Sequence, residues 1–136
     1  MGMIRMIEIM QVGHIGIRVK DRDRSKAFYR KLGFEPVRED PDDMVIIVRN
    51  RNDIEINFIV NANDENDGKN VLMDVDVKYP GFTHVALQVP SIEGTAKALE
   101  EAGIRTSGNR MHGDKKVALF IRDPDQNVIE FVTDKD

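Results

Sequence analysis

The sequence predicts an α+β fold made of two tandem βαβββ modules, and three observations lead to it. Each half of the 136-residue chain holds one helical pattern among four β-rich runs. Residues 14–34 align without a gap on residues 84–104, so the two halves repeat each other. Turn-forming clusters, "PDD", "RND" and "DPDQ", separate later strands. We therefore expect two modules of the same topology, each a curled half-sheet of mixed or antiparallel strands.

The first module is expected over residues 11–62. An apolar run at 12–19 predicts its first strand, and "KDRDRSKAFYRKLGF" predicts a helix that Asp21 or Asp23 caps and Gly33 ends. Three further strands follow in "FEPVRED", "MVIIVRN" and "DIEINFIV". The expected order is therefore one strand, one helix and three strands.

The same order returns after a polar linker at residues 63–81, in a second module over residues 82–134. "FTHVALQV" predicts its first strand, and Ser91 caps a helix that ends at Gly103. "IRTSGNR", "KVALFIRD" and "NVIEFVTD" predict the last three strands. The chain, residues 1–136, is expected to be a single domain.

Composition and charge limit the classes of function. The chain has no cysteine, so a metal could be held only by nitrogen and oxygen ligands. Its 20 basic and 24 acidic residues form no long block, which disfavours a nucleic-acid partner. No apolar run approaches the roughly 20 residues that span a bilayer, so we expect no membrane segment and a cytoplasmic protein. Arg5 and Glu8 interrupt the apolar "MGMIRMIEIM", which we expect to form a short extra strand of the mature protein.

Two histidines and two glutamates recur at matching places in the halves. His14 aligns with His84 under a shift of 70 residues, and Glu55 aligns with Glu130 under a shift of 75. Alone, such a glutamate would face solvent and such a histidine would be a hydrogen-bonded core residue. Together they are expected to converge into one cup that holds a divalent ion, Ni, Zn, Mn, Co or Fe. The alternative is a degenerate copy that keeps the residues without the ion.

The segments "GHIGIRVKDRDRSKAFYRKLGF", "IEINF", "GFTHVALQV" and "FIRDPDQNVIEF" resemble the vicinal oxygen chelate superfamily. That superfamily includes glyoxalase I, methylmalonyl-CoA epimerase, extradiol dioxygenases, and fosfomycin and bleomycin resistance proteins. The resemblance covers residues 12–134 and implies that the two modules frame one metal cup. One departure is Gln126, which stands where these proteins usually have glycine in the turn before the last strand.

The ligand set, with all four positions filled by His14, Glu55, His84 and Glu130, looks most like that of glyoxalase I. The resemblance implies a glyoxalase-like lyase or isomerase, in which the ion stabilises an enediolate, Glu130 takes the proton next to a carbonyl, and Glu55 is the second acid/base. Two alternatives stay open. One is an extradiol-type dioxygenase, since such enzymes use two histidines and one carboxylate, and the other is a non-catalytic binding protein of the resistance type.

Four further side chains are expected to bind a small-molecule substrate. Arg18 stands where the resemblance places an arginine for the glutathione carboxylate, whereas Ile59 replaces an amide expected for the same peptide. Alternation along the strands adds Asn57, Gln88 and Phe120. The alternative for Arg18 is a surface residue paired with a nearby acid.

A homodimer is expected from the resemblance, and because a curled half-sheet leaves an open edge and an apolar face. The long stretch 61–82 would let the modules pair within one chain or be exchanged between chains. The sequence leaves both arrangements open.

Overall fold

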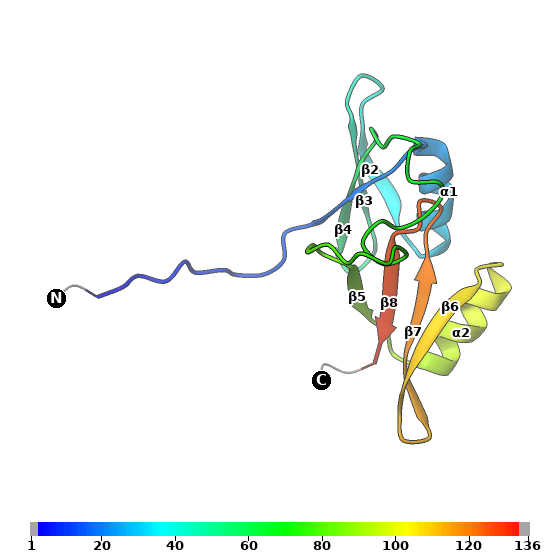
Figure 1. Cartoon of the computed structure of the whole chain (residues 1–136). Helices are drawn as coiled ribbons and strands as arrows, with labels where there is room; N and C mark the ends of the chain where they lie inside the picture. The colour runs from blue at the N-terminus through cyan, green and yellow to red at the C-terminus, as the bar shows by residue number, and fades with distance from the viewer. Residues whose placement is uncertain (1–2, 134–136) are drawn as a thin grey trace.

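A computed structural model of the chain describes residues 3–133 and contains two four-stranded mixed sheets with two helices (Figure 1). Sheet A comes from the first half of the chain and sheet B from the second, and this arrangement confirms the α+β fold of two βαβββ modules. The sheets are curled and do not close into a barrel. The elements in chain order are β1 (Ile15–Arg18), α1 (Arg22–Lys31), β2 (Glu35–Glu39), β3 (Val45–Arg49), β4 (Glu55–Ile59), β5 (His84–Gln88), α2 (Ile92–Glu101), β6 (Thr106–His112), β7 (Lys115–Arg122) and β8 (Val128–Val132).

Both sheets have the same strand order, which is the structural form of the sequence repeat. Sheet A runs β1-β4-β3-β2 and sheet B runs β5-β8-β7-β6. In each sheet the first strand of the module pairs parallel with the last, and the other pairs are antiparallel. The histidine-bearing strand of each module therefore lies directly beside its glutamate-bearing strand.

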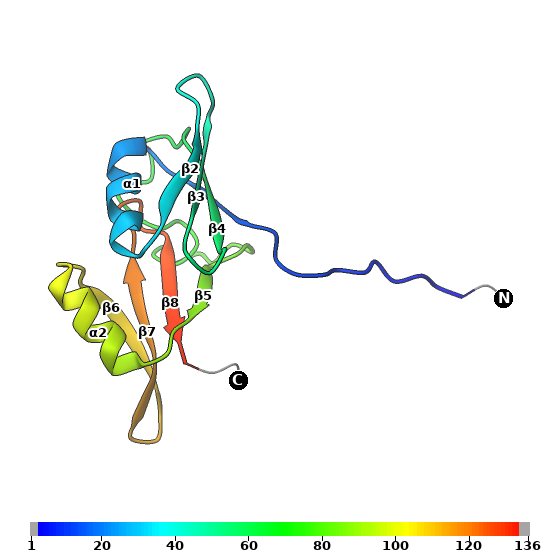
Figure 2. The same cartoon turned by 180° about the vertical axis from the view of Figure 1, so that it is seen from behind.

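The helices begin at the expected caps. The Asp21 carboxylate accepts a hydrogen bond from the Arg24 backbone N–H at 2.8 Å, and the Ser91 hydroxyl accepts one from the Gly94 N–H at 3.0 Å. Both helices end before a glycine with positive φ, which ordinary side chains rarely adopt. In Figure 2 the two helices lie on the same side of the molecule, each beside the sheet of its own module.

The core lies between each sheet and its helix. On sheet A, Ile56 and Phe58 of β4 are buried, and the Tyr29 ring of α1 lies 5.0 Å from that of Phe58. On sheet B, Ile129 and Phe131 of β8 are buried in the same way. Because side chains alternate, the opposite face of each sheet is left for the glutamates.

The two modules are joined by polar contacts at the β7–β8 turn, of which the contact between Tyr29 and Asp123 is buried. The Tyr29 hydroxyl donates to the Asp123 carboxylate at 2.8 Å, and each residue is 2% exposed. Burial is the main cause that raises the pKa of Asp123 above its usual value, and the pKa of Tyr29 is also raised. Asp125 accepts from the backbone N–H of Lys20 at 3.2 Å and from Arg24 Nη2 at 2.9 Å. This turn therefore anchors the start of α1 to the second module.

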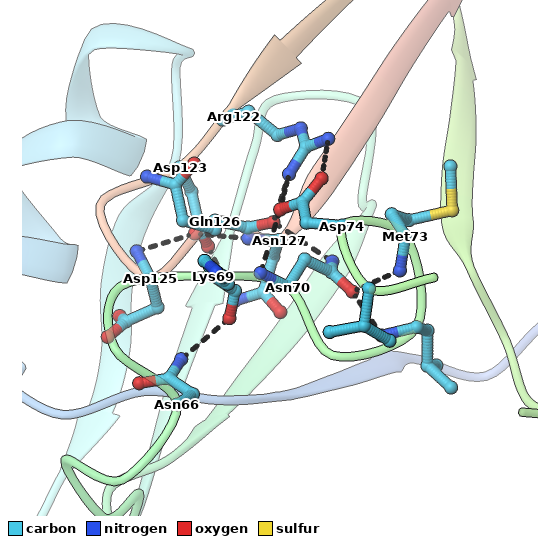
Figure 3. Close-up of polar contacts among 12 residues, drawn as sticks. Asn66, Lys69, Asn70, Met73, Asp74, Arg122, Asp123, Asp125, Gln126 and Asn127 are labelled. Carbon is cyan, nitrogen blue, oxygen red and sulfur yellow. Dashed lines mark hydrogen bonds and ion pairs between the residues drawn. The ribbon is translucent and has the colours of Figure 1, made fainter. Parts of the chain in front are cut away.

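The linker is tied to the same turn (Figure 3). Arg122 makes two bonds of 3.0 Å to the Asp74 carboxylate, and this pairing is the main cause that lowers the pKa of Asp74. Asn70 Nδ2 donates to the Gln126 carbonyl at 3.0 Å. Gln126, where the family resemblance leads one to expect glycine, adopts φ 69°. The departure thus leaves a left-handed turn in place, with a side chain that this conformation disfavours.

The extra strand expected at the N-terminus is not formed. Residues 3–14 carry neither helix nor strand, and residues 1–2 lie outside the described part of the chain, as does residue 134 of the expected second module. A strand needs a neighbouring backbone to accept its hydrogen bonds, and Ile15 is the first residue that pairs with β4. Residues 3–14 instead lead away from the sheets (Figures 1 and 2). Within residues 3–133, none of the helices is long and apolar enough to cross a membrane.

Candidate metal centre

The first module brings His14 and Glu55 together on the face of sheet A opposite the core. His14 directly precedes β1 and Glu55 begins the adjacent β4, so His14 Nδ1 lies 3.9 Å from Glu55 Oε2. The Glu55 carboxylate also accepts a bond of 2.8 Å from Arg49 Nη2 on β3. Arg49 is the residue that pairs with Glu55 across the hairpin. A nitrogen and an oxygen donor thus lie side by side at the rim of the sheet.

The second module repeats the arrangement with a shorter distance between histidine and glutamate. His84 Nε2 lies 3.2 Å from Glu130 Oε1, and Glu130 is only 6% exposed. The other ring nitrogen of His84 is 2.8 Å from the Thr83 hydroxyl, and the Phe120 ring meets the imidazole edge-on with centroids 6.2 Å apart. A partner on Nδ1 fixes the ring orientation and leaves Nε2 directed at Glu130.

Each glutamate has an arginine beside it, and sequence reasoning missed both arginines. Arg110 Nη2 on β6 is 3.5 Å from Glu130 Oε2, as Arg49 is bonded to Glu55. Arg49 could have been found, because it and Glu55 are equally distant from the centre of the turn that joins β3 to β4. Arg110 could not, because β6 changes register on either side of it. Thr83 was also missed, although it directly precedes His84.

Of the four side chains expected to bind substrate, two lie beside the His–Glu pairs and two make hydrogen bonds elsewhere. Phe120 lies beside Glu130 on the neighbouring strand and touches His84. Asn57 lies two residues beyond Glu55 on the same face, and its Oδ1 is buried without a hydrogen-bond partner. Arg18 is exposed and its Nε donates to Asn61 Oδ1 at 2.8 Å. Gln88 is directed to the end of its strand, where Nε2 donates to the Thr133 carbonyl at 3.0 Å.

These donors fit a divalent ion. Two ligands on neighbouring corners of an octahedron, each about 2.1 Å from the ion, lie about 3 Å apart, and the 3.2 Å between His84 and Glu130 is close to that separation. Imidazole nitrogen and carboxylate oxygen suit Zn, Ni, Mn, Co and Fe. The unpartnered Asn57 Oδ1 could accept a hydrogen bond from a water or substrate hydroxyl at the same face.

The two His–Glu pairs do not meet within one chain. Among residues 3–133, no three or more His, Asp or Glu side chains are grouped closely enough to hold one ion. Each module presents two donors, whereas stable sites use three or four protein ligands. Residues 3–133 therefore present two separate His–Glu pairs, and they do not bring all four side chains into one cluster.

A cavity of about 510 Å³ lies beneath the linker, along the edges of β1 and β5. Its volume is in the range of small-molecule sites. Its lining includes Ile17 and Leu87, which point away from the His–Glu face, and linker residues such as Asn70. Arg18 and His84 also border the cavity, so the cavity reaches the two strands that lead from the candidate metal ligands His14 and His84.

Comparison with known proteins places the chain in a family. The sequence model of the Glyoxalase/Bleomycin resistance protein/Dioxygenase superfamily matches residues 11–131. The trivalent organoarsenical cleaving enzyme of Bacillus sp. (strain MD1) is 31% identical over 130 residues, which cover 90% of this chain and 72% of that enzyme. The chain belongs to this superfamily, as the sequence motifs predicted.

Solved structures agree with this assignment. A glyoxalase family protein from Enterococcus faecalis has 26% sequence identity and a TM-score of 0.71, over 90% of this chain and 96% of that one. A lactoylglutathione lyase from Agrobacterium tumefaciens has 16% identity and a TM-score of 0.64, over 90% and 92% of the two chains, and it supports the fold alone. The superfamily includes glyoxalases, bleomycin resistance proteins and dioxygenases, so membership does not select a reaction.

Proposed function

We propose that the protein is a glyoxalase-like lyase or isomerase that depends on a divalent metal ion and moves a proton next to a carbonyl group. The observation that supports this most is the repeated pairing of His14 with Glu55 and of His84 with Glu130, on the same face of each module. Four filled ligand positions fit this chemistry better than a dioxygenase, which needs open positions for two reactants.

The centre is completed by two copies of the chain in a homodimer. His14 and Glu55 of one copy would join His84 and Glu130 of the other, because each chain holds the pairs apart. By two-fold symmetry a dimer would then contain two equal centres. β1 and β5 are edge strands of their sheets, which is consistent with assembly.

Different residues of the chain would serve proton transfer and substrate binding. A bound ion would act as a Lewis acid for neighbouring substrate oxygens. Glu130, which is nearly buried and has His84 and Arg110 beside it, takes the substrate proton and returns it to the adjacent carbon. Glu55 is the second acid/base, which moves a proton on the substrate oxygens. Phe120 and Asn57 line the same faces and would orient the substrate, with Arg18 at the rim. Gln88 would contribute less to substrate binding, since its amide already donates to the Thr133 carbonyl.

Replacing Glu55 tests the reaction class. Hemithioacetals of 2-oxoaldehydes and acyl-CoA epimers are screened in deuterated water, where proton transfer to and from a carboxylate brings solvent deuterium into the product. Glu55→Gln should lower turnover at least about 100-fold, as expected for loss of an acid/base group. Glu35→Gln, on an exposed β2 position, is the matched control and should leave turnover unchanged.

Other outcomes would contradict the proposal. Oxygen consumption with catechols that survives Glu55→Gln would identify a dioxygenase, in which Glu55 is not required. Tight binding of a small molecule by metal-free protein, with no turnover of any substrate, would identify a resistance-type binding protein. In either case the proton-transfer assignment to Glu130 would be wrong.

The similarity to the organoarsenical cleaving enzyme suggests a second candidate function, cleavage of trivalent organoarsenicals. Trivalent arsenic is a soft centre that binds thiolates best, and this chain has no cysteine to offer. Substrate capture by protein thiolates is therefore excluded for this chain. Release of arsenite from a trivalent arylarsenical by the metal-loaded protein would support this candidate over the lyase.

A further inference from the structure

The most exposed apolar surface of the protein is the segment that precedes β1. We call residues 3–12 the arm, and its seven large apolar side chains are between 77% and 95% exposed. These side chains are Met3, Ile4, Met6, Ile7, Ile9, Met10 and Val12. The arm extends away from both sheets in each view (Figures 1 and 2). Monomeric proteins rarely expose a contiguous apolar patch of this kind, so the arm requires a partner surface.

A second exposed apolar surface lies in the segment that precedes β5. We call residues 71–82 the linker segment, and it exposes Phe82 completely and Val77 and Tyr79 to more than half. Its further exposed apolar side chains are Val71 and Met73. Unlike the arm, this segment is held in place by the Asp74–Arg122 ion pair, so its apolar side chains are presented on a fixed backbone.

The two segments occupy equivalent places in the repeat. The shift of 70 residues that aligns His14 with His84 also aligns Val12 with Phe82. Each segment therefore leads into a histidine of the candidate centre and reaches it two residues later. Two residues of extended chain span only about 7 Å.

A centre shared between two copies brings these segments together. Nitrogens of His14 and His84 that bind one ion at about 2.1 Å lie no more than about 4 Å apart. Val12 of one copy and Phe82 of the second copy would then enter the same small region from opposite modules. The partner of the arm is thereby specified as a second copy of this chain.

We propose that the arm of each copy packs on the linker segment of the other. The proposal rests on the centre being shared between copies, as set out above. Two identical contacts would form in the dimer, and each would remove from water the apolar side chains that an isolated chain exposes. Docking of the arm also fixes the backbone that immediately precedes His14, so the arm positions a ligand of the centre.

Cross-linking tests the contact directly, because the chain has no cysteine of its own. Val12→Cys and Phe82→Cys chains are co-expressed with different tags, purified without metal as the mixed dimer, and treated with a short bismaleimide. Rapid formation of a cross-linked dimer between the two tagged chains is expected. The matched control pairs Phe82→Cys with Val37→Cys, a half-exposed apolar position on β2, and should react much more slowly. Equal rates for the two pairs would overturn the proposal.

The strength of the contact is measured by analytical ultracentrifugation of metal-free protein. Ile9→Asp places a charge in the middle of the arm and should raise the dimer dissociation constant at least about 50-fold, whereas Val37→Asp should change it less than about threefold. Circular dichroism verifies that both variants are folded. An Ile9→Asp dimer as tight as the wild type would contradict the proposal.

These results can be separated from those on the proposed function. A cross-link between positions 12 and 82 in a protein that binds no divalent ion would support the arm contact and refute the metal centre. Conversely, an ion that requires both His14 and His84 in a protein without that cross-link would support the metal centre and refute the arm contact.

Discussion

Removal of the Tyr29 hydroxyl tests the buried link that joins the two modules. Tyr29→Phe keeps the ring, and with it the contact to Phe58, but deletes the hydroxyl that donates to Asp123. The Asp123 carboxylate retains three N–H donors, from the Asp125 backbone and from the backbone and side chain of Asn127. The variant should therefore fold to the same structure, with a weaker contact between the two modules.

The size of the effect follows from burial and charge. A hydrogen bond to a charged group contributes about 1.5 to 3 kcal/mol, and Tyr29 and Asp123 are both 2% exposed. Because the other donors remain, we expect a loss of about 2 kcal/mol in the free energy of unfolding. For a chain of this size that corresponds to a fall in Tm of about 6 to 8 °C.

Urea unfolding followed by circular dichroism at fixed protein concentration gives the measurement, with the slope m expected to stay unchanged. Tyr79→Phe is the matched control, because Tyr79 is 60% exposed and should change stability by less than about 0.5 kcal/mol. The Tyr29 hydroxyl stabilises the ionised Asp123, whose pKa burial raises. The loss should thus be largest near neutral pH and shrink as the pH falls through that raised pKa. A loss of less than about 0.5 kcal/mol in the free energy of unfolding at pH 7 would show that the Tyr29–Asp123 hydrogen bond does not stabilise the protein.

Two further predictions concern the linker and its turn. Gln126→Gly should raise the free energy of unfolding by about 0.5 to 1 kcal/mol in urea unfolding, because Gln126 has φ 69°; a decrease would show that its side chain contributes more than the strain costs. Asp74→Asn should lower the free energy of unfolding at pH 7 and make that free energy fall less steeply as the pH is lowered. The reason is that the pairing with Arg122 lowers the pKa of Asp74, so the contribution of Asp74 to stability is present above about pH 4 and is lost as the pH falls through the lowered pKa. Unfolding curves from pH 3 to 7 that match the wild type would contradict this.

The repeated halves explain how much of the fold was predictable. Strand alternation and the shifts of 70 and 75 residues were enough to group His14, Glu55, His84 and Glu130 as candidate ligands. The placing of each histidine beside the glutamate of its own module comes from the parallel pairing of the first and last strands. Helix caps at Asp21 and Ser91 are local features and were predictable for that reason.

What could not be predicted depends on register and on contacts between the modules. Arg110 reaches Glu130 through a strand whose register shifts twice, and no sequence pattern indicates where such a shift occurs. The separation of the two His–Glu pairs in one chain follows from contacts such as Tyr29 with Asp123, which are far apart in sequence. The prediction of an extra N-terminal strand was wrong, because residues 3–14 form no strand pairing with the rest of the described chain.

A metal centre shared between two copies can be detected from the metal content of a mixed dimer, measured by elemental analysis. His14→Ala and His84→Ala chains are co-expressed with different tags and loaded with Ni, Zn, Mn, Co or Fe. One of the two centres in the mixed dimer then keeps both histidines, whereas each variant alone has lost a ligand from every centre. We expect about one ion per chain in the wild type, almost none in either variant alone, and about half the wild-type content in the mixed dimer. A mixed dimer as empty as the single variants would show that the centre is not shared, and a wild type that binds no ion would contradict the metal centre itself.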